Sequence, residues 1–136
     1  MKIYIGADHA GYRLKEELKK YFNLIDLGNN QLDQNDDYPD FARKVSQKVK
    51  KDKNSKGILI CGGGQGMSMV ANRHKNIRAA LCYNLKSAKL SRQHNNANVI
   101  TIGARLTKKN VALKCVNTFI KTNFMGGRHL RRIKKI

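Results

Sequence analysis

A single thiol stands at the start of a glycine-rich turn. Cys61 ends a short apolar run and is followed by Gly62-Gly63-Gly64-Gln65-Gly66. Where a strand passes through such a turn into a helix, free backbone N–H groups and the helix dipole converge and favour an anion. A thiol at that point has a lowered pKa, so Cys61 could act as a nucleophile or accept a proton. The alternative is that the glycines only make a tight turn and that Cys61 is a small buried hydrophobe, the role we expect for Cys82 and Cys115.

Histidines and carboxylates are the other candidates for chemistry. Asp8-His9 follows the first apolar run and His94-Asn95 precedes the last one, whereas His74 and His129 are expected at a helix end and in a basic tail. A loop histidine serves catalysis only where its surroundings place its titration usefully. All nine acidic residues lie between Asp8 and Asp52, so a catalytic carboxylate must come from this part of the chain.

Several reaction classes lack the residues they need. Asp8, His9, Asp36 and Asp37 are the only metal-ligating types that stand close together, and the second half of the chain has no carboxylate to bridge a metal pair. No metal and no cofactor are therefore expected. The glycine turn is not a Walker A loop and lacks the ribose-binding acid of a dinucleotide fingerprint, and no serine-hydrolase nucleophile elbow is present.

The charge of the chain is strongly basic and unevenly distributed. The formal net charge is +19, and the segment from Lys53 to Ile136 has eighteen Lys and Arg residues and no acid. Such a surface attracts phosphorylated metabolites, nucleic acid or acidic lipid, although lysines that merely solvate the surface are an alternative. Aromatic residues do not interleave with the basic ones, and no recognition helix or RNA-binding signature is present. Nucleic-acid binding therefore remains a rival hypothesis that the charge suggests. Because these recognition features are absent, we do not expect a nucleic-acid partner.

The positions of these groups depend on a regular alternation of elements along the 136 residues. Apolar runs predict strands at Lys2–Ala7, Leu24–Gly28, Gly57–Cys61, Arg78–Tyr83 and Val99–Gly103. Amphipathic segments predict helices over Gly11–Phe22, Asp40–Lys51, Met67–Ala71, Lys86–Arg92 and the residues after Thr107, which can cap the last long helix. This order predicts one domain over residues 1–136. Its expected fold is a three-layer α/β/α sandwich with a five-stranded, mainly parallel, Rossmann-like sheet and a basic C-terminal tail at Gly126–Ile136.

This fold predicts where the chemistry is located. Ligands of open α/β sheets bind beyond the carboxyl ends of the strands. We therefore expect Asp8-His9, Cys61 with its glycine turn, and Gly103-Ala104-Arg105 at one edge of the sheet. His94-Asn95 is expected in the loop just before the last strand.

The cysteines and the apolar runs bear on the cellular compartment. Three cysteines without Cys-X-X-Cys spacing are typical of reduced thiols in a cytoplasm. The apolar runs are far shorter than the about 20 residues of a membrane span, and the N-terminus lacks a signal-peptide cleavage pattern. We expect a cytoplasmic protein without a membrane partner.

Five motifs in order resemble the ribose-5-phosphate isomerase B family, within the sugar-phosphate isomerases that include the galactose-6-phosphate isomerase subunits. The resemblance covers the chain from Lys2 to the basic tail. Its motifs are Asp8-His9-Ala10-Gly11, Asp37-Tyr38-Pro39, Ile60-Cys61-Gly62-Gly63-Gly64-Gln65-Gly66, Ser91-Arg92-Gln93-His94-Asn95 and Gly126-Gly127-Arg128-His129-Leu130-Arg131-Arg132.

The resemblance implies interconversion of ribose 5-phosphate and ribulose 5-phosphate through a cis-enediolate without metal, in the non-oxidative branch of the pentose phosphate pathway. It implies that Cys61 accepts the proton and that His94, helped by Asp8, opens the sugar ring. It also implies a set of substrate-binding residues: His9, Tyr38, Gly62, Gly63, Gly64, Gln65, Gly66, Asn95, Arg105, Arg128 and Arg132. The amides of the glycine turn, with Asn95 beside them, would hold the enediolate oxygen. His9 and the three arginines would bind phosphate, and Tyr38 would line the sugar site.

The resemblance further implies a homodimer, or a dimer of such dimers, in which the partner subunit supplies Arg128 and Arg132. One position departs from the family, whose members generally carry Ser or Thr two residues after the base, where this chain has Gly63. The missing hydroxyl leaves two alternatives open. One is an isomerase of allose or galactose 6-phosphate with the same mechanism, and the other is a protein that binds sugar phosphates without turning them over.

Overall fold

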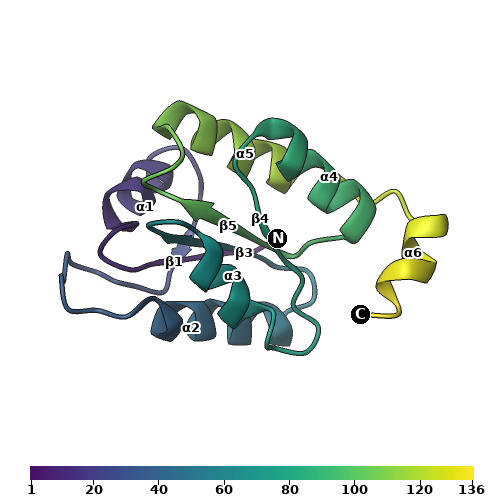
Figure 1. The fold of residues 1–136 in the computed structure, drawn as a ribbon, viewed down its shortest axis with the longest axis horizontal. Helices are drawn as coiled ribbons and strands as arrows, with labels where there is room; N and C mark the ends of the chain where they lie inside the picture. Colours follow the sequence, from purple (N-terminus) through teal and green to yellow (C-terminus); the bar gives the residue numbers. More distant parts are fainter.

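The computed structural model describes residues 1–136, which form a parallel sheet with helices on both faces (Figure 1). The strands are β1 (Ile3–Ala7), β2 (Ile25–Asp26), β3 (Lys56–Cys61), β4 (Ala79–Leu81) and β5 (Val99–Gly103). Their order across the sheet is β2-β1-β3-β5-β4, and every neighbouring pair is parallel. The predicted α/β/α architecture is confirmed, with a sheet that is wholly parallel.

Six helices cover this sheet and extend beyond it. They are α1 (Tyr12–Lys19), α2 (Tyr38–Lys51), α3 (Gln65–Ala71), α4 (Leu85–Asn95), α5 (Lys109–Lys121) and α6 (Arg128–Ile133). None of them combines the length and the apolar composition that crossing a bilayer requires.

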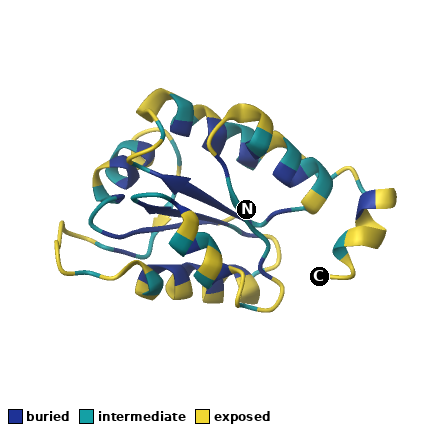
Figure 2. Ribbon diagram, viewed as in Figure 1, coloured by how far each residue is buried: buried dark blue, intermediate teal, exposed yellow.

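The central strand β3 separates two hydrophobic cores. Ile58 and Ile60 belong to the core under α1, α4 and α5, whereas Leu59 and Cys61 belong to the core under α2 and α3. Because successive side chains of a strand point to opposite faces, an uninterrupted apolar run is required where both faces are covered. The buried residues of Figure 2 accordingly follow the strands and the inner faces of the helices.

One local prediction near the C-terminal end of the chain is wrong, and the basic tail contains an element that the sequence did not predict. Thr107 does not cap the last long helix, because α5 begins at Lys109 with Lys108 at its N-cap and no capping side chain. The expected basic tail also contains a helix, α6. Gly126 and Gly127 adopt φ of +67° and +57°, which turns the chain before this helix. Figure 1 shows α6 projecting beyond the edge of the sheet at which the strands begin.

Candidate active site

Cys61 lies at the carboxyl end of β3, directly before the turn that leads into α3. Its side chain is almost buried, and the backbone N–H of Gly64 donates a hydrogen bond to its Sγ at 3.1 Å. Gly64 has φ of +79°, and a Cβ on it would come within 2.9 Å of the amide nitrogen of Gly103. Glycine is therefore required at this position, which aims an N–H at the sulfur.

Asp8 is a neighbour of Cys61 because β1 and β3 are paired. Ala7 lies opposite Ile60, and the N–H of Asp8 donates to the carbonyl of Ile60 at 3.3 Å. Asp8 is 5 % exposed, and its Oδ1 accepts a hydrogen bond from the N–H of Gly11 at 3.1 Å. Burial raises the pKa of Asp8 above its ordinary value, against the effect of this amide and of His9.

His9 is held by a residue that the sequence did not single out for the site. Nδ1 of His9 lies 2.8 Å from Oδ1 of Asp36, which also accepts the backbone N–H of His9 at 2.9 Å. The other oxygen of Asp36 accepts a hydrogen bond from Asn29 at 3.2 Å. The bond to Asp36 raises the pKa of His9, so the ring carries positive charge to a higher pH.

Asp8, His9 and Asp36 bring their donor atoms within 4.8 Å of one another, a spacing that a metal ion could bridge. Both oxygens of Asp36 already accept hydrogen bonds, and Oδ1 of Asp8 accepts one as well. These bonds explain the cluster as an arrangement that positions His9. Asp36 is 27 residues from His9 in the sequence, and only the fold of the loop before α2 brings them together.

Tyr38 and Arg105 border the glycine turn from two sides. Tyr38 is the first residue of α2, and its ring lies against Gly66, where a Cβ would come within 2.7 Å of Cε2. The N–H of Arg105 donates to the carbonyl of Gly62 at 3.0 Å, and the Arg105 guanidinium lies beside the same glycine. The carboxyl edge therefore assembles most of the predicted site, including Asp8, His9 and Cys61.

Gly63, unlike the neighbouring Gly64, does not have a positive φ. The space that a side chain on Gly63 would enter is occupied by the carboxamide oxygen of Gln65. The sequence indicated a missing hydroxyl at this position. The structure shows a different polar group in its place.

His94 and Asn95 lie at the opposite edge of the sheet. The helix α4 returns from β4 to the start of β5 and so runs against the strands. Nε of Arg78, just before β4, donates to the carbonyl of Asn95 at 3.2 Å. The length of β3 separates the two edges by about 16 Å. Within a single chain, His94 is therefore distant from Asp8, and Asn95 is distant from the glycine turn.

The tail joins His94 at this second edge. The rings of His94 and His129 stack with centroids 4.3 Å apart and planes inclined by 12°. Burial lowers the pKa of His129, and His94, Arg128 and Arg132 lower it further, so the ring favours its neutral form. Arg128 and Arg132 form no ion pair within the chain. The predicted site thus consists of two halves: the carboxyl-edge half around Cys61 and the amino-edge half around His94 and α6.

Known proteins share both the sequence and the fold. A probable ribose-5-phosphate isomerase B of Mycoplasma genitalium is 51% identical over 140 residues, which cover 98% of this chain and 92% of that protein. Ribose-5-phosphate isomerase B of Escherichia coli is 38% identical, with 99% of this chain and 93% of that protein covered. The crystal structure of the Mycoplasma genitalium enzyme with bound ribulose-5-phosphate superimposes with a TM-score of 0.94 at 48% identity, over 98% of this chain and 92% of that one.

The parallel α/β fold and these relatives together identify the class of the protein as a sugar-phosphate isomerase. A family model described as ribose/galactose isomerase matches residues 3–136. The chain belongs to this family, and the resemblance to ribose-5-phosphate isomerase B that its five motifs indicated is confirmed.

Proposed function

We propose that this chain interconverts ribose 5-phosphate and ribulose 5-phosphate, with each active site composed of residues from two subunits. The observation that carries this proposal is the 0.94 TM-score to an isomerase with ribulose-5-phosphate bound, together with a carboxyl-edge half that contains a base, an anion cradle and cations for phosphate. The proposed place of the reaction is the non-oxidative branch of the pentose phosphate pathway. A cytoplasmic location agrees with three free cysteines.

The proposed chemistry moves one proton between neighbouring carbons of the open-chain sugar. Cys61, as the thiolate, takes the proton from C2, and the electron pair moves through the C1–C2 bond onto the carbonyl oxygen. The cis-enediolate that forms is held by the N–H groups of Gly62–Gly66. Cys61 then returns the proton to C1 while the O2 proton moves to O1, which gives the ketose. Stabilisation of the developing oxyanion is usually the larger contribution, and the positioned base adds about 10²–10⁴-fold.

Phosphate binding would supply the energy that orients the sugar. His9 carries its positive charge to a higher pH because of Asp36, and Arg105 lies across the glycine turn. Contacts to a phosphate that is remote from the reacting carbons can be used for orientation at those carbons. Asp8 stands next to the base, and a ring-opening histidine brought over Cys61 by the partner subunit would come near it, which agrees with an assisting role in ring opening.

The amino-edge half completes the site in the proposed homodimer. A two-fold axis that brings His94 and α6 of one subunit over Cys61 of the partner forms two equivalent sites. Both surfaces expose apolar side chains that such a contact would cover: Met125, Leu130 and Ile136 around α6, and Tyr83 and Leu106 beside the glycine turn. Ring opening by His94 and phosphate binding by Arg128 and Arg132 are then functions of the partner subunit.

The pentose is favoured over a hexose because Gly63 does not enlarge the site. The carboxamide of Gln65 occupies the space beside Gly63, so the absence of a side chain on this glycine does not by itself open room for an additional carbon. The test is to follow ketose formation from ribose 5-phosphate, allose 6-phosphate and galactose 6-phosphate with EDTA present. We expect turnover with ribose 5-phosphate to be the fastest. Preference for a hexose phosphate would transfer the proposal to that substrate, and turnover of none of them would refute the enzyme.

A further inference from the structure

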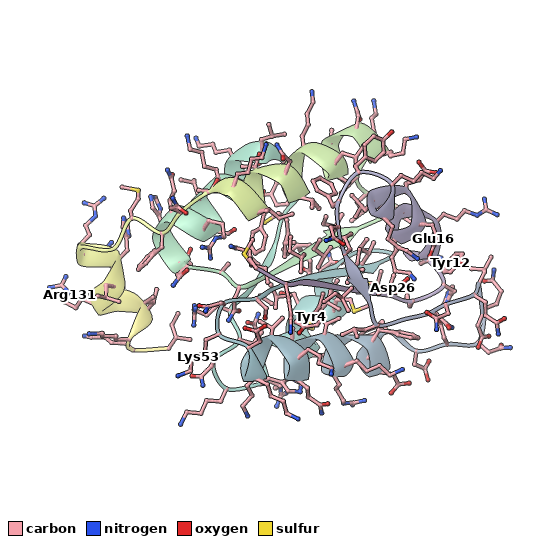
Figure 3. All side chains as sticks on the ribbon, turned by 180° about the vertical axis from the view of Figure 1, so that it is seen from behind. Tyr4, Tyr12, Glu16, Asp26, Lys53 and Arg131 are labelled. Atoms are coloured by element: carbon pink, nitrogen blue, oxygen red, sulfur yellow. The ribbon has the colours of Figure 1, made fainter.

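A basic pocket lies at the amino edge of the sheet, between the turn after α2 and the end of α4. It has a volume of about 240 Å³. Four cationic and four neutral polar side chains line it, and no acidic or apolar one does: Lys53, Asn54, Ser55, Lys56, Arg78, Arg92, Asn96 and Asn98. In Figure 3, Lys53 marks this end of the molecule, and Asp26 and Glu16 lie toward the other end.

The four cations of this pocket have no carboxylate partner. None of them is within 4.0 Å of an acidic oxygen, because every ion pair of the chain involves other residues. Arg92 is only 8 % exposed. Burial lowers the pKa of Lys56, and the charge of Arg92 lowers it further. Like charges gathered without a counter-ion repel one another, and this cost is removed when an anion binds.

The arginines of the pocket are held rigidly and still have free donors. Nε of Arg78 donates to the carbonyls of Asn95 and Asn96, and Arg92 donates from Nε to Thr122 and from Nη1 to Asn96 and Ala97. These contacts leave both terminal nitrogens of Arg78 and Nη2 of Arg92 without a protein acceptor. Planar guanidinium groups with free terminal nitrogens are suited to phosphate oxygens.

A second copy of this chain has few free carboxylates with which to neutralise the pocket. Most of its nine acids are already engaged in hydrogen bonds or ion pairs within the subunit: Asp8, Glu16, Glu17, Asp26, Asp36 and Asp40. Among the remaining acids, Asp33 and Asp52 each accept a backbone N–H of their own loop. Asp37 is the one acid without such a contact, so a second copy offers at most one unengaged side-chain carboxylate to the four cations, and an anion from outside the protein matches their charge better.

We propose that this pocket binds an oligophosphate, an anion with two or more linked phosphate groups. Four cations exceed the charge of a single phosphate group, and no aromatic side chain lines the pocket to stack on a base. Arg78 also lines two adjoining hollows, with Lys50 in one and Arg73, Lys75 and Lys134 in the other, so a longer phosphate chain can continue along the edge. The pocket lies at the end of the sheet opposite Cys61 of the same chain and adjoins the end of α4, and its anion is distinct from the sugar-phosphate substrate of the proposed function.

The test is calorimetric titration of the full chain with tripolyphosphate, in the presence of saturating ribose 5-phosphate to occupy the sugar-phosphate site. We expect one tripolyphosphate per chain and weaker binding of inorganic phosphate. The double variant Lys53→Gln/Lys56→Gln should weaken binding about tenfold or more, the effect of losing one charged hydrogen bond. Replacing these lysines preserves the arginine contacts that hold the backbone.

The matched control is Lys86→Gln/Lys114→Gln, which removes the same charge from exposed positions of α4 and α5. It should leave the affinity for tripolyphosphate within twofold. Equal weakening in both double variants would show general electrostatic attraction and overturn the proposal. Absence of tripolyphosphate binding would also overturn the proposal. If tripolyphosphate does not bind and Lys53→Gln/Lys56→Gln dimerises more weakly than the wild type, the pocket belongs to the subunit contact instead. An oligonucleotide that binds there in preference to tripolyphosphate would assign it to nucleic acid instead. The titration does not require turnover, so failure of the isomerase assay leaves its result interpretable.

Discussion

At the scale of single residues, Cys61 differs from the other two cysteines in its surroundings. An amide N–H is aimed at its sulfur, whereas Cys82 is enclosed in the core, where burial raises its pKa to about 11. Burial also raises the pKa of Cys115. The prediction that Cys82 and Cys115 are buried hydrophobes is confirmed by their positions in the core.

Cys61→Ala should abolish isomerisation and leave the affinity for sugar phosphate nearly unchanged, because loss of the base raises the barrier without affecting ground-state binding. We expect kcat to fall by about 10²–10⁴-fold. Stopped-time assays and calorimetry measure the two quantities separately. Cys115→Ala serves as the control and should retain turnover. Full activity of Cys61→Ala would exclude it as the base, and loss of folding would show that it is only a core residue.

Gly63→Thr introduces the side-chain type that the family usually carries. The backbone of Gly63 accepts a β-branched residue, and the only obstacle is the flexible end of Gln65. We expect a folded protein whose turnover of ribose 5-phosphate is unchanged or raised. A double-mutant cycle with Gln65→Val should show coupling of more than about 0.5 kcal/mol, because the two side chains compete for one space. Collapse of activity in a folded Gly63→Thr protein would show that this loop differs from that of the family.

Asp36→Asn should shift the pH profile of the reaction. The bond to Asp36 raises the pKa of His9, so the imidazolium that would bind phosphate persists to higher pH. Without the carboxylate the pKa of His9 falls, and kcat/KM for ribose 5-phosphate should decline with rising pH at a lower pH than in the wild type. Asp33→Asn, an exposed change in the same loop, should leave the profile where it is. An unchanged profile for Asp36→Asn would mean that His9 binds phosphate in neutral form or not at all.

At the scale of elements, a buried ion pair connects α1 to the end of β2. Lys15 is fully buried, and its Nζ lies 2.6 Å from Oδ2 of Asp26 and 2.6 Å from the carbonyl oxygen of Asn29. Burial by itself would raise the pKa of Asp26, but the hydrogen bonds from Lys15 and Lys19 outweigh burial and lower it. The short edge strand β2 and the loop that carries Asp36 depend on this contact.

Asp26→Asn should lower the free energy of unfolding at neutral pH by about 3 kcal/mol, because it removes the closer of the two carboxylates that pair with the buried charge of Lys15 and leaves only Glu16 at 3.2 Å. A carboxyl group whose pKa is lower in the folded than in the unfolded state stabilises the folded protein at pH values above its unfolded pKa. This stabilisation is lost as the pH falls through the folded-state pKa. Urea unfolding should therefore show a smaller difference between wild type and variant in acid than at pH 7. Asp40→Asn, which removes an exposed pair with Arg43, should change stability by less than about 1 kcal/mol. A pH-independent difference for Asp26→Asn would contradict the ionic origin of the effect.

At the scale of the whole molecule, the direction of α4 divides the predicted site. A helix that connects two parallel strands must run against them, so its last residues lie at the edge where the strands begin. His94 and Asn95 are these last residues, and α6 packs beside them. One subunit therefore carries the two halves of the proposed site at opposite edges of its sheet.

Mixed dimers test whether two subunits share each site. Cys61→Ala and His94→Ala should each be nearly inactive alone, because each removes one half of every site. When equal amounts are co-refolded, half of the dimers are mixed. Each mixed dimer contains one site with both changes and one intact site, so about a quarter of the wild-type activity should return. The pair Cys61→Ala and Arg128→Ala/Arg132→Ala should behave in the same way. Mixed dimers that mass spectrometry confirms but that remain inactive would refute the shared site.

The sequence alone was sufficient to predict the layered fold and the carboxyl-edge half. Continuous apolar runs are required of strands that are buried on both faces, and helical periodicity marks the segments between them. Residues that directly follow such strands must gather at one edge, which is why Asp8, His9, Cys61 and Arg105 were placed together correctly. The glycine turn was also visible, because its conformation requires glycine within a few residues of sequence.

The tertiary structure decided everything that depends on long-range geometry. The strand order, the bond from Asp36 to His9 and the competition of Gln65 for the space beside Gly63 are not local properties of the chain. His94 lies just before the last strand as expected, but in the final turn of α4 rather than in a loop, and only the tertiary structure shows that the tail packs beside it. The amino-edge pocket was hidden from the sequence, since its cations come from three separate segments and only packing reveals that no carboxylate reaches them.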